Sequence, residues 1–194
     1  MVEVKSRVDT HDYSRESSRV NSTRLFVLGA LAKNGPMHGH QIRKAAQQDR
    51  TELWTDIKPG SLYGALHRMA ADGVVEVVRT EHEGNMPPRT VYAITAEGWE
   101  ELEQHRDEAI GGVRLPPDPV DLALQFVQDL SSDEVRDLMT ARRDEIAKRL
   151  AAWRQVRDQA APYLRGYEPL VIRHNQFRLE AELAWHEEFL EEMT

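Results

Sequence analysis

The apolar positions between residues 58 and 98 change their spacing along the chain, and each change predicts a new element. The first set recurs at spacings of four, three and one residue, which places its members on one face of a helix. These positions are Leu62, Leu66, Met69 and Ala70. Pro59 suits the first turn of this helix, because its missing N–H would have no partner there. Gly73 stands where a left-handed residue commonly ends a helix.

Two strands and a further helix are predicted after this helix. Residues 74–81 (VVEVVRTE) and 89–95 (RTVYAIT) are rich in β-branched side chains, which favour strands. The stretch between them contains glycine, asparagine and two prolines, so it predicts a long hairpin tip. Thr95 offers an N-cap oxygen to a helix that begins near Ala96.

Two more helices are predicted upstream. Residues 24–33 (RLFVLGALAK) are almost wholly apolar, which suits a short buried helix, and the Asn-Gly-Pro sequence that follows ends it. Residues 39–48 place Ile42 and two alanines inward and polar side chains outward, as expected for the first helix of a helix-turn-helix pair. The predicted order of elements is that of a winged helix-turn-helix, a fold that points to DNA.

Three separated blocks in this half resemble the PadR family of bacterial transcriptional regulators: LGALAKNGPMHGHQI, KPGSLYGALHRMAADGVVE and PPRTVYAITAEG. The resemblance implies a dimeric DNA-binding repressor whose helical C-terminal part supplies dimerisation and often responds to a ligand. The sequence departs from the family at three positions: His40 replaces an aromatic residue, Thr90 a common wing lysine and Val91 the first of two tyrosines. We therefore expect the wing to bind DNA phosphates less strongly than in relatives.

The candidate DNA-binding residues lie on the outward side of the helix after Pro59 and on the wing. They are Lys58, Ser61, Tyr63, His67, Arg68, Arg79 and Arg89. Arg68 is suited to guanine in the major groove, and Ser61 or Tyr63 to phosphate. Lys58 is suited to phosphate, and the two wing arginines to phosphate or the minor groove. The alternatives are a solvated charge for each basic residue and half-buried packing for Tyr63.

The second half of the chain predicts three helices. Asp118 and Pro119 begin the first, over residues 120–130, which we expect to bury Leu122, Phe126 and Leu130. A capping box at residues 131–134 starts the second, which runs to about residue 161 and carries an apolar stripe. The stripe consists of Leu138, Met139, Ile146, Leu150 and Trp153.

The last helix, from about residue 168 or 170 to 193, carries residues at heptad spacing. They are Leu179, Leu183, His186, Leu190 and Met193, here called the seam. A second subunit is the predicted partner of the seam, and an intramolecular hairpin with the long helix is the alternative. The sequence thus predicts a mainly α fold with a small β-wing. Its predicted parts are a polar tail (1–21), a winged helix-turn-helix domain (22–110) and an all-α dimerisation and effector domain (111–194).

The net charge of −8 is unevenly distributed. Residues 1–98 hold 13 Lys/Arg and 12 Asp/Glu, a net of +1, and the remaining residues hold 12 and 21, a net of −9, which together give −8. DNA affinity follows the number of phosphates neutralised locally, so an acidic second half does not exclude a DNA-binding first half.

A small planar aromatic effector is a further predicted partner, since aromatic residues concentrate outside the predicted DNA-reading part. Trp99 and Trp185 are the candidates, and ordinary core packing is the alternative. No cofactor or metal is expected: His38 and His40 are two residues apart but lack a clear third ligand.

The composition excludes several other classes. The chain has no cysteine, no apolar run of membrane-spanning length and no signal-peptide core, so we expect a soluble cytoplasmic protein. No nucleophile elbow, P-loop or Rossmann fingerprint is present, so an enzyme is not expected. Two hypotheses remain: a ligand-responsive repressor acting on an operator, and a winged-helix assembly module without specific DNA binding.

Overall fold

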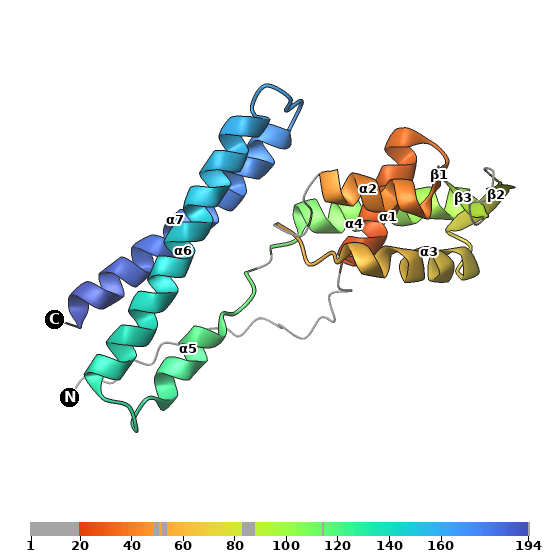
Figure 1. Ribbon diagram of the computed structural model, residues 1–194. Coiled ribbons are helices and arrows are strands. Elements are labelled where there is room, and N and C mark those ends of the chain that lie inside the picture. The colour runs from red at the N-terminus through yellow and green to blue at the C-terminus, as the bar shows by residue number, and fades with distance from the viewer. Residues whose placement is uncertain (1–19, 49–50, 52–53, 83–87, 114, 194) are drawn as a thin grey trace. The chain divides into compact units, whose positions relative to one another are not determined.

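The computed structural model describes residues 20–48, 51, 54–82, 88–113 and 115–193. The chain divides into two compact units between residues 114 and 115 (Figure 1). Most of the predicted polar tail and of the hairpin tip lie outside the described residues.

The first unit begins with two helices joined by a short strand. α1 spans Ser22–Asn34, capped by the Asn21 side chain and ended by Gly35 at a φ of 76°. β1 spans Met37–His38, and α2 spans Gly39–Gln48 and buries Ile42 and Ala46 as predicted. The two-residue strand was not predicted: its residues were expected in a turn. It forms because it pairs with a strand more than fifty residues away, at Tyr92 and Val91.

The predicted helix after Pro59 is confirmed. A 3-10 turn over Pro59–Ser61 leads into α3, Leu62–Ala71. Its inward face is wholly buried, and the residues there are Leu62, Ala65, Leu66 and Met69. The N–H groups of Gly73 and Val74 donate to carbonyls of the last turn at 3.2 and 3.1 Å, with Gly73 at a φ of 78°. This pattern is a Schellman C-cap, and it turns the chain directly into the wing.

The wing is a three-stranded antiparallel sheet in the order β1-β3-β2. β2 spans Val75–Glu81 and β3 spans Arg89–Ile94. The β2 and β3 register shifts between Val77 and Arg79, which is the sign of a β-bulge. Arg79 therefore lies opposite Val91, and Glu81 lies opposite Arg89.

α4, Ala96–Gly111, closes the first unit. The Thr95 hydroxyl accepts from the Gly98 N–H at 3.1 Å and donates to the Gly73 carbonyl at 2.8 Å, so one side chain starts α4 and ties it to the end of α3. α1, α3 and the sheet enclose one core with α2 and α4. Its fully buried side chains include Val27, Leu28, Leu31, Ile42, Leu62, Leu66, Met69 and Val75.

In the second unit the first predicted helix is shorter than expected. α5 covers only Pro119–Ala123, and one 3-10 turn, Leu124–Phe126, follows it. Leu122 is 61% exposed and Phe126 is 69% exposed, so the expectation that both are buried is wrong for the single chain. The helix ends before an i, i+4, i+8 stripe can form.

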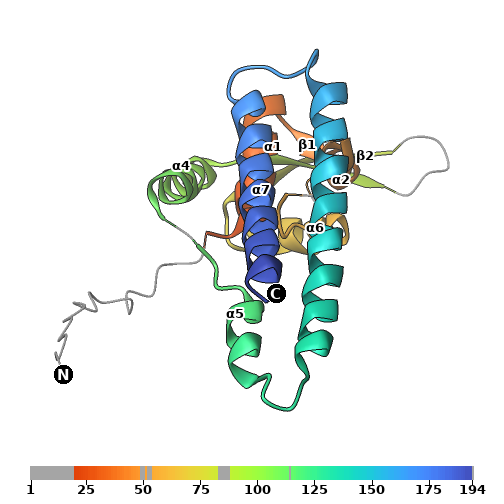
Figure 2. The same cartoon turned by 90° about the vertical axis from the view of Figure 1, so that its left-hand side faces the viewer.

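α6, Ser132–Ala160, and α7, Glu168–Glu192, lie side by side as an antiparallel hairpin (Figures 1 and 2). The predicted capping box at Ser131 and Glu134 is present. Val135 and four residues of the predicted stripe face α7, whereas Leu138 is 63% exposed. Leu138 is one position away from the buried stripe, which passes through Met139 instead.

His186 is the one residue of the seam that is completely buried, and it faces α6 of the same chain. Its Nε2 accepts from the Arg142 guanidinium at 2.9 Å, while its Nδ1 donates to the Glu182 carbonyl at 2.7 Å. The intramolecular alternative therefore accounts for His186, which is a core residue of the hairpin. The rest of the seam is partly exposed: Leu179, Leu183, Leu190 and Met193.

Candidate nucleic-acid interface

The outward face of α3 carries the side chains that the sequence singled out. Ser61, His67 and Arg68 are exposed, and Tyr63 is 40% exposed. Ser61 Oγ donates to the Lys58 carbonyl at 2.8 Å, which fixes the turn before α3. The Arg68 guanidinium lies back over Gly64: a Cβ added to Gly64 would be 3.4 Å from Arg68 Nη1. The four residues form one continuous polar face.

Tyr63 is both exposed and packed. A Cβ at Gly39 would lie 2.6 Å from the Tyr63 ring, so the ring rests directly on the first residue of α2. The close approach is possible because Gly39 has no side chain. Half-buried packing, the alternative reading of Tyr63, is thus correct for one face of the ring, and the contact locks α3 against the start of α2.

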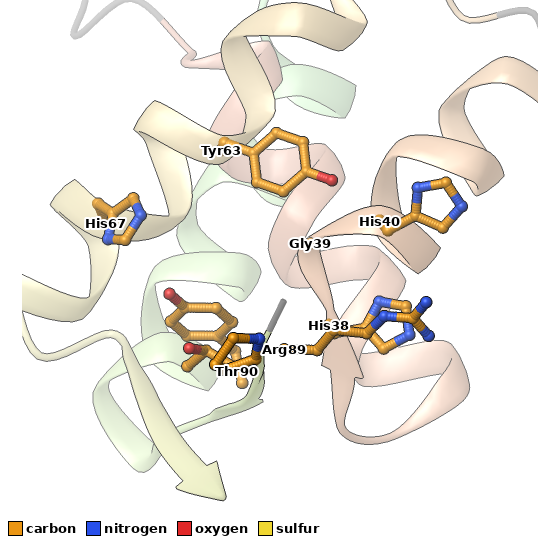
Figure 3. A pocket seen from close by; sticks show the side chains of 9 residues that line it. His38, Gly39, His40, Tyr63, His67, Arg89 and Thr90 are labelled. Carbon is orange, nitrogen blue, oxygen red and sulfur yellow. The ribbon is translucent and has the colours of Figure 1, made fainter. Parts of the chain in front are cut away.

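A hollow of about 390 Å³ lies between the start of α2, α3 and the wing (Figure 3). It is lined by His38, Gly39, His40, Tyr63, His67, Pro88, Arg89, Thr90 and Tyr92. Three predicted residues, Tyr63, His67 and Arg89, meet here from α3 and β3. His38 and His40 join them, and neither was predicted for this role because the hollow forms only when distant segments pack together.

None of the described residues that line the hollow is a carboxylate, although the chain has 33 Asp and Glu. His38 and His40 are stacked with ring centroids 6.1 Å apart. His38 also caps α2: its Nδ1 accepts from the Gln41 N–H at 3.2 Å, and the Gln41 side chain accepts from the His38 N–H at 2.9 Å. This reciprocal pair resembles a capping box with histidine in place of serine.

The other predicted basic residues lie apart from this hollow. Lys58 is exposed before the 3-10 turn. Arg79 is on β2 and pairs with Glu81 at 2.7 Å, with more than half of its side chain exposed. The pair is easily exchanged for a phosphate, because exposed ion pairs contribute little.

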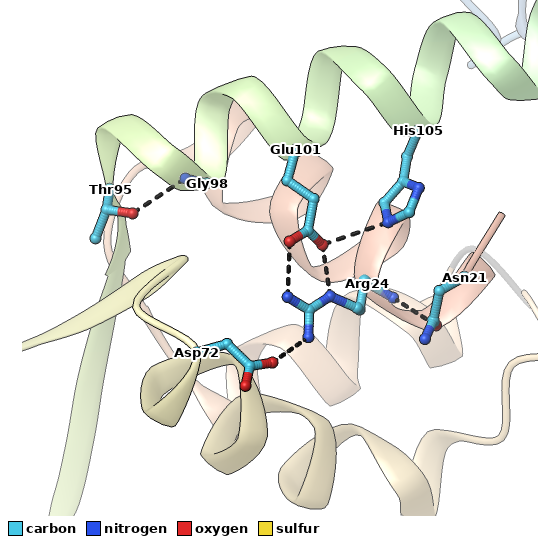
Figure 4. A network of polar contacts seen from close by, with 7 residues as sticks. All are labelled: Asn21, Arg24, Asp72, Thr95, Gly98, Glu101 and His105. Atoms are coloured by element: carbon cyan, nitrogen blue, oxygen red, sulfur yellow. Dashed lines mark hydrogen bonds and ion pairs between the residues drawn. The ribbon is translucent and has the colours of Figure 1, made fainter. Parts of the chain in front are cut away.

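A partly buried ion-pair network holds α3 in place behind its outward face (Figure 4). The Arg24 guanidinium of α1 binds Glu101 of α4 through two nitrogens, one at 2.7 Å, and Asp72 at the end of α3 at 2.6 Å. His105 adds a contact to Glu101 at 3.3 Å. The hydrogen bond from Arg24 lowers the pKa of the Glu101 carboxyl, against the opposing effect of its burial. The network thus joins three helices at one guanidinium.

The two candidate ligand residues lie in different units. Trp99 is on α4 and is 46% exposed. Trp185 is on α7 and partly buried. Its ring meets the His186 ring edge-on, with the ring centroids 4.7 Å apart, and its centroid lies 5.7 Å from that of Phe189. Neither tryptophan lines the hollow in Figure 3.

Within the described residues, no group of three His, Asp or Glu is placed to hold a metal ion. Over the same part of the chain, no helix has the length and apolar character needed to cross a membrane.

The order of helices, the three-stranded wing and the polar face of α3 define a winged helix-turn-helix protein. Residues 27–104 match the family model described as the transcriptional regulator PadR-like family, and residues 119–194 match the one described as virulence activator alpha C-term. The first unit, over residues 27–104, therefore belongs to the PadR-like family of transcriptional regulators.

One curated relative is an uncharacterized 37.1 kDa protein in transposon TN4556 of Streptomyces fradiae, 38% identical over 86 residues. The match covers 44% of this chain and 22% of that protein, so the chain spans about a fifth of its relative's length.

Solved structures share the fold. Bacillus subtilis PadR in complex with operator DNA has a TM-score of 0.70 at 21% identity, covering 89% of this chain and 99% of that one. The same protein in complex with p-coumaric acid has a TM-score of 0.68 at 21% identity, covering 90% and 99%. The PadR-like regulator BC1756 from Bacillus cereus has a TM-score of 0.61 at 18% identity, covering 88% and 97%.

Proposed function

We propose that this chain is a dimeric repressor that binds operator DNA through α3 and the wing and leaves it when a small aromatic ligand binds. The observation that carries the proposal is the exposed face of α3. Ser61, Tyr63, His67 and Arg68 point outward from a helix whose other side is fully buried. A helix presented in this way fits the major groove, where side chains read base edges.

The proposed contacts divide by role. Arg68 would read a guanine, while Lys58, Arg79 and Arg89 would bind phosphates on either side of α3. A structure of the Bacillus subtilis relative contains operator DNA, which supports the same use of the fold here. The net charge of +1 in residues 1–98, against −9 in the rest, also favours DNA approach to the part of the chain that carries α3 and the wing.

A gel-shift assay with the DNA upstream of the protein's own gene tests the proposal. We expect a discrete shifted band at low salt that an excess of unrelated duplex does not abolish. An intact protein that shifts no duplex would favour the assembly module instead.

Arg68→Ala should weaken binding to that DNA by roughly 5-fold to 150-fold, because one bidentate contact to a base contributes about 1–3 kcal/mol. The loss should be larger on the specific duplex than on unrelated DNA. Arg149→Ala is the matched control, since Arg149 lies on α6 and pairs only with Glu145 on its own helix surface. An equal loss in both variants would contradict the role given to Arg68.

We propose that two chains associate through the second unit. Leu179, Leu183, Leu190 and Met193 are only partly covered by α6, and further apolar side chains stand in solvent. They include Leu122, Phe126 and Leu138, each more than 60% exposed. Exposed apolar side chains of this kind are typical of a surface that another chain covers. Light scattering should give the mass of two chains, and the mass of one chain at micromolar concentration would contradict the proposal.

The proposed effector is a planar aromatic acid or a similar flat compound. A structure of the Bacillus subtilis relative contains p-coumaric acid. Trp99 and Trp185 are the candidate contacts, both with exposed ring surface. Titration of tryptophan fluorescence with p-coumaric acid and other flat compounds should give saturable quenching that is reduced in Trp99→Phe or Trp185→Phe. A flat response to all compounds would contradict a ligand of this class.

Activation of transcription is a second candidate function, beside repression. Residues 119–194 match a family model described as a virulence activator C-terminal part, which favours activation. A reporter gene behind the bound promoter separates the two: deletion of the regulator should raise expression for a repressor and lower it for an activator.

A further inference from the structure

We propose that the hollow between α2, α3 and the wing binds one backbone phosphate of DNA, and that protonation of His40 and His67 strengthens this contact. The inference rests on the proposed DNA binding and adds to it a pH dependence located at named residues. The DNA affinity of this chain should therefore rise as the pH falls through the range in which imidazoles titrate.

The shape and chemistry of the hollow suit a phosphate. Its volume of about 390 Å³ far exceeds that of one phosphate group, so the sugar-phosphate backbone can enter it from the open side. Among the described residues of its wall, every charged or chargeable side chain other than the tyrosines is basic: Arg89 and three histidines. Tyr63 and Thr90 add hydroxyl donors. An anion with several acceptor oxygens satisfies this set, and a cation does not.

His40 and His67 are the two imidazoles able to gain a proton there. Both are exposed, and among the described residues neither ring forms a hydrogen bond or an ion pair. In Figure 3 the Tyr63 ring lies between them, with its hydroxyl directed toward His40. A protonated imidazole has two N–H donors and a positive charge, so each ring improves as a phosphate ligand on protonation.

His38 has a different role because its Nδ1 is occupied. Nδ1 accepts from the Gln41 N–H, and a proton on that nitrogen would break the cap of α2. Neutral His38 therefore keeps its proton on Nε2, where it remains a fixed donor on the side of the hollow. The proton-linked gain is thus assigned to His40 and His67 only.

The surrounding charges set the direction of the effect. Arg43 and Lys44 lie three and four positions after His40 on α2, and Arg89 lines the same hollow from β3. Glu81 lies opposite Arg89 in the sheet but pairs with Arg79. A bound phosphate reverses the local balance and favours the charged rings.

The test measures binding of a labelled duplex to the full chain by fluorescence anisotropy at pH 8 and pH 6, at constant ionic strength. The duplex is the one shifted in the gel assay. Because a protonated imidazole has two N–H donors and a positive charge, the affinity should be higher at pH 6 than at pH 8. We expect at least a tenfold tighter Kd at pH 6 for the unmodified protein.

The double variant His40→Gln and His67→Gln distinguishes the proposed source of the pH dependence from others. It keeps polar side chains at both positions but removes the two imidazoles that can take up a proton. Its Kd should change by less than about twofold between the two pH values. His174→Gln is the matched control, because His174 is exposed on α7 in the other unit. The salt dependence gives a second readout: the slope of log K against log salt should be steeper at pH 6 than at pH 8.

Three outcomes are decisive. A tenfold gain that the double variant loses and the control retains supports the proposal. A pH-independent Kd, or a gain of equal size in the double variant, overturns it while leaving DNA binding intact. Absence of binding at both pH values overturns the proposed function together with this inference. Circular dichroism at each pH confirms that the variants are folded.

Discussion

Gly98→Ala is expected to unfold the first unit or to destabilise it by at least about 3 kcal/mol. A Cβ at this position would lie 2.0 Å from the Val74 carbonyl oxygen and 2.8 Å from the Ile94 side chain. The nearer atom belongs to the backbone at the start of the wing, so it cannot rotate away. α4 would have to move off the sheet, and the Thr95 bonds that start α4 would break.

Gly29→Ala is the matched control for this effect. Gly29 also lies in a helix, but a Cβ there has no atom within 4 Å. Alanine is preferred over glycine inside a helix by about 0.5–1 kcal/mol, so this variant should be slightly more stable. Hydrogen exchange of α1, α3 and α4 amides in the full chain measures both changes. Similar protection in the two variants would contradict the close packing of α4 on the wing.

Arg24→Met should lower the free energy of unfolding of the first unit by about 2–3 kcal/mol. This is somewhat less than the loss expected when a fully buried ion pair is broken, because the side chains of Arg24 and Glu101 are 20% exposed. The substitution keeps the bulk of the side chain but leaves the Glu101 carboxylate without its main partner. Asp72 loses its contact as well, so the end of α3 is no longer tied to α1 and α4. Arg106→Met is the control, since Arg106 pairs only with its exposed neighbour Asp107 and should change stability by less than about 0.5 kcal/mol.

The pH dependence gives this prediction a second readout. Arg24 lowers the pKa of Glu101 in the folded protein, so the pair stabilises the fold above the ordinary carboxyl range and loses this contribution as the pH falls through the lowered pKa. The stability difference between the unmodified protein and Arg24→Met should therefore be full at pH 7 and shrink below about pH 4. A difference that stays constant down to pH 3 would show that the ion pair is not its source.

Local patterns predicted most of the elements because each depends on residues close in sequence. The α3 face follows from the spacing of Leu62, Leu66 and Met69, and its end from Gly73, whose φ is positive. Thr95 and Ser131 were predicted as caps, and both accept the expected backbone hydrogen bond. The outward placement of Arg68 and His67 is a direct consequence of the same period.

The features that were missed depend on contacts between distant segments. β1 has only two residues, too few for any period, and exists because β3 supplies its partner. His40 became part of the hollow through the packing of Tyr63 on Gly39, which no spacing rule contains. Leu122 and Phe126 were expected in a core because they are apolar, yet apolar character cannot tell an intramolecular core from a surface that another chain covers.

The same distinction applies to the seam. The heptad spacing of Leu183, His186 and Leu190 indicates a packed face but does not name the partner. In the single chain α6 covers His186 completely and leaves the leucines partly exposed. The seam therefore serves the hairpin at its centre, and its edges remain candidates for the second subunit.

The salt dependence of DNA binding tests the central claim most directly. With Lys58, Arg79 and Arg89 on phosphates in each of two subunits, log K for the upstream duplex should fall against log salt with a slope of about −5. Fluorescence anisotropy of the full chain between 50 and 200 mM salt would measure it. A steep slope with saturable binding is the predicted result. A protein that is dimeric and folded but shows no saturable binding at 50 mM salt would contradict the assignment of α3 and the wing as a DNA-reading surface.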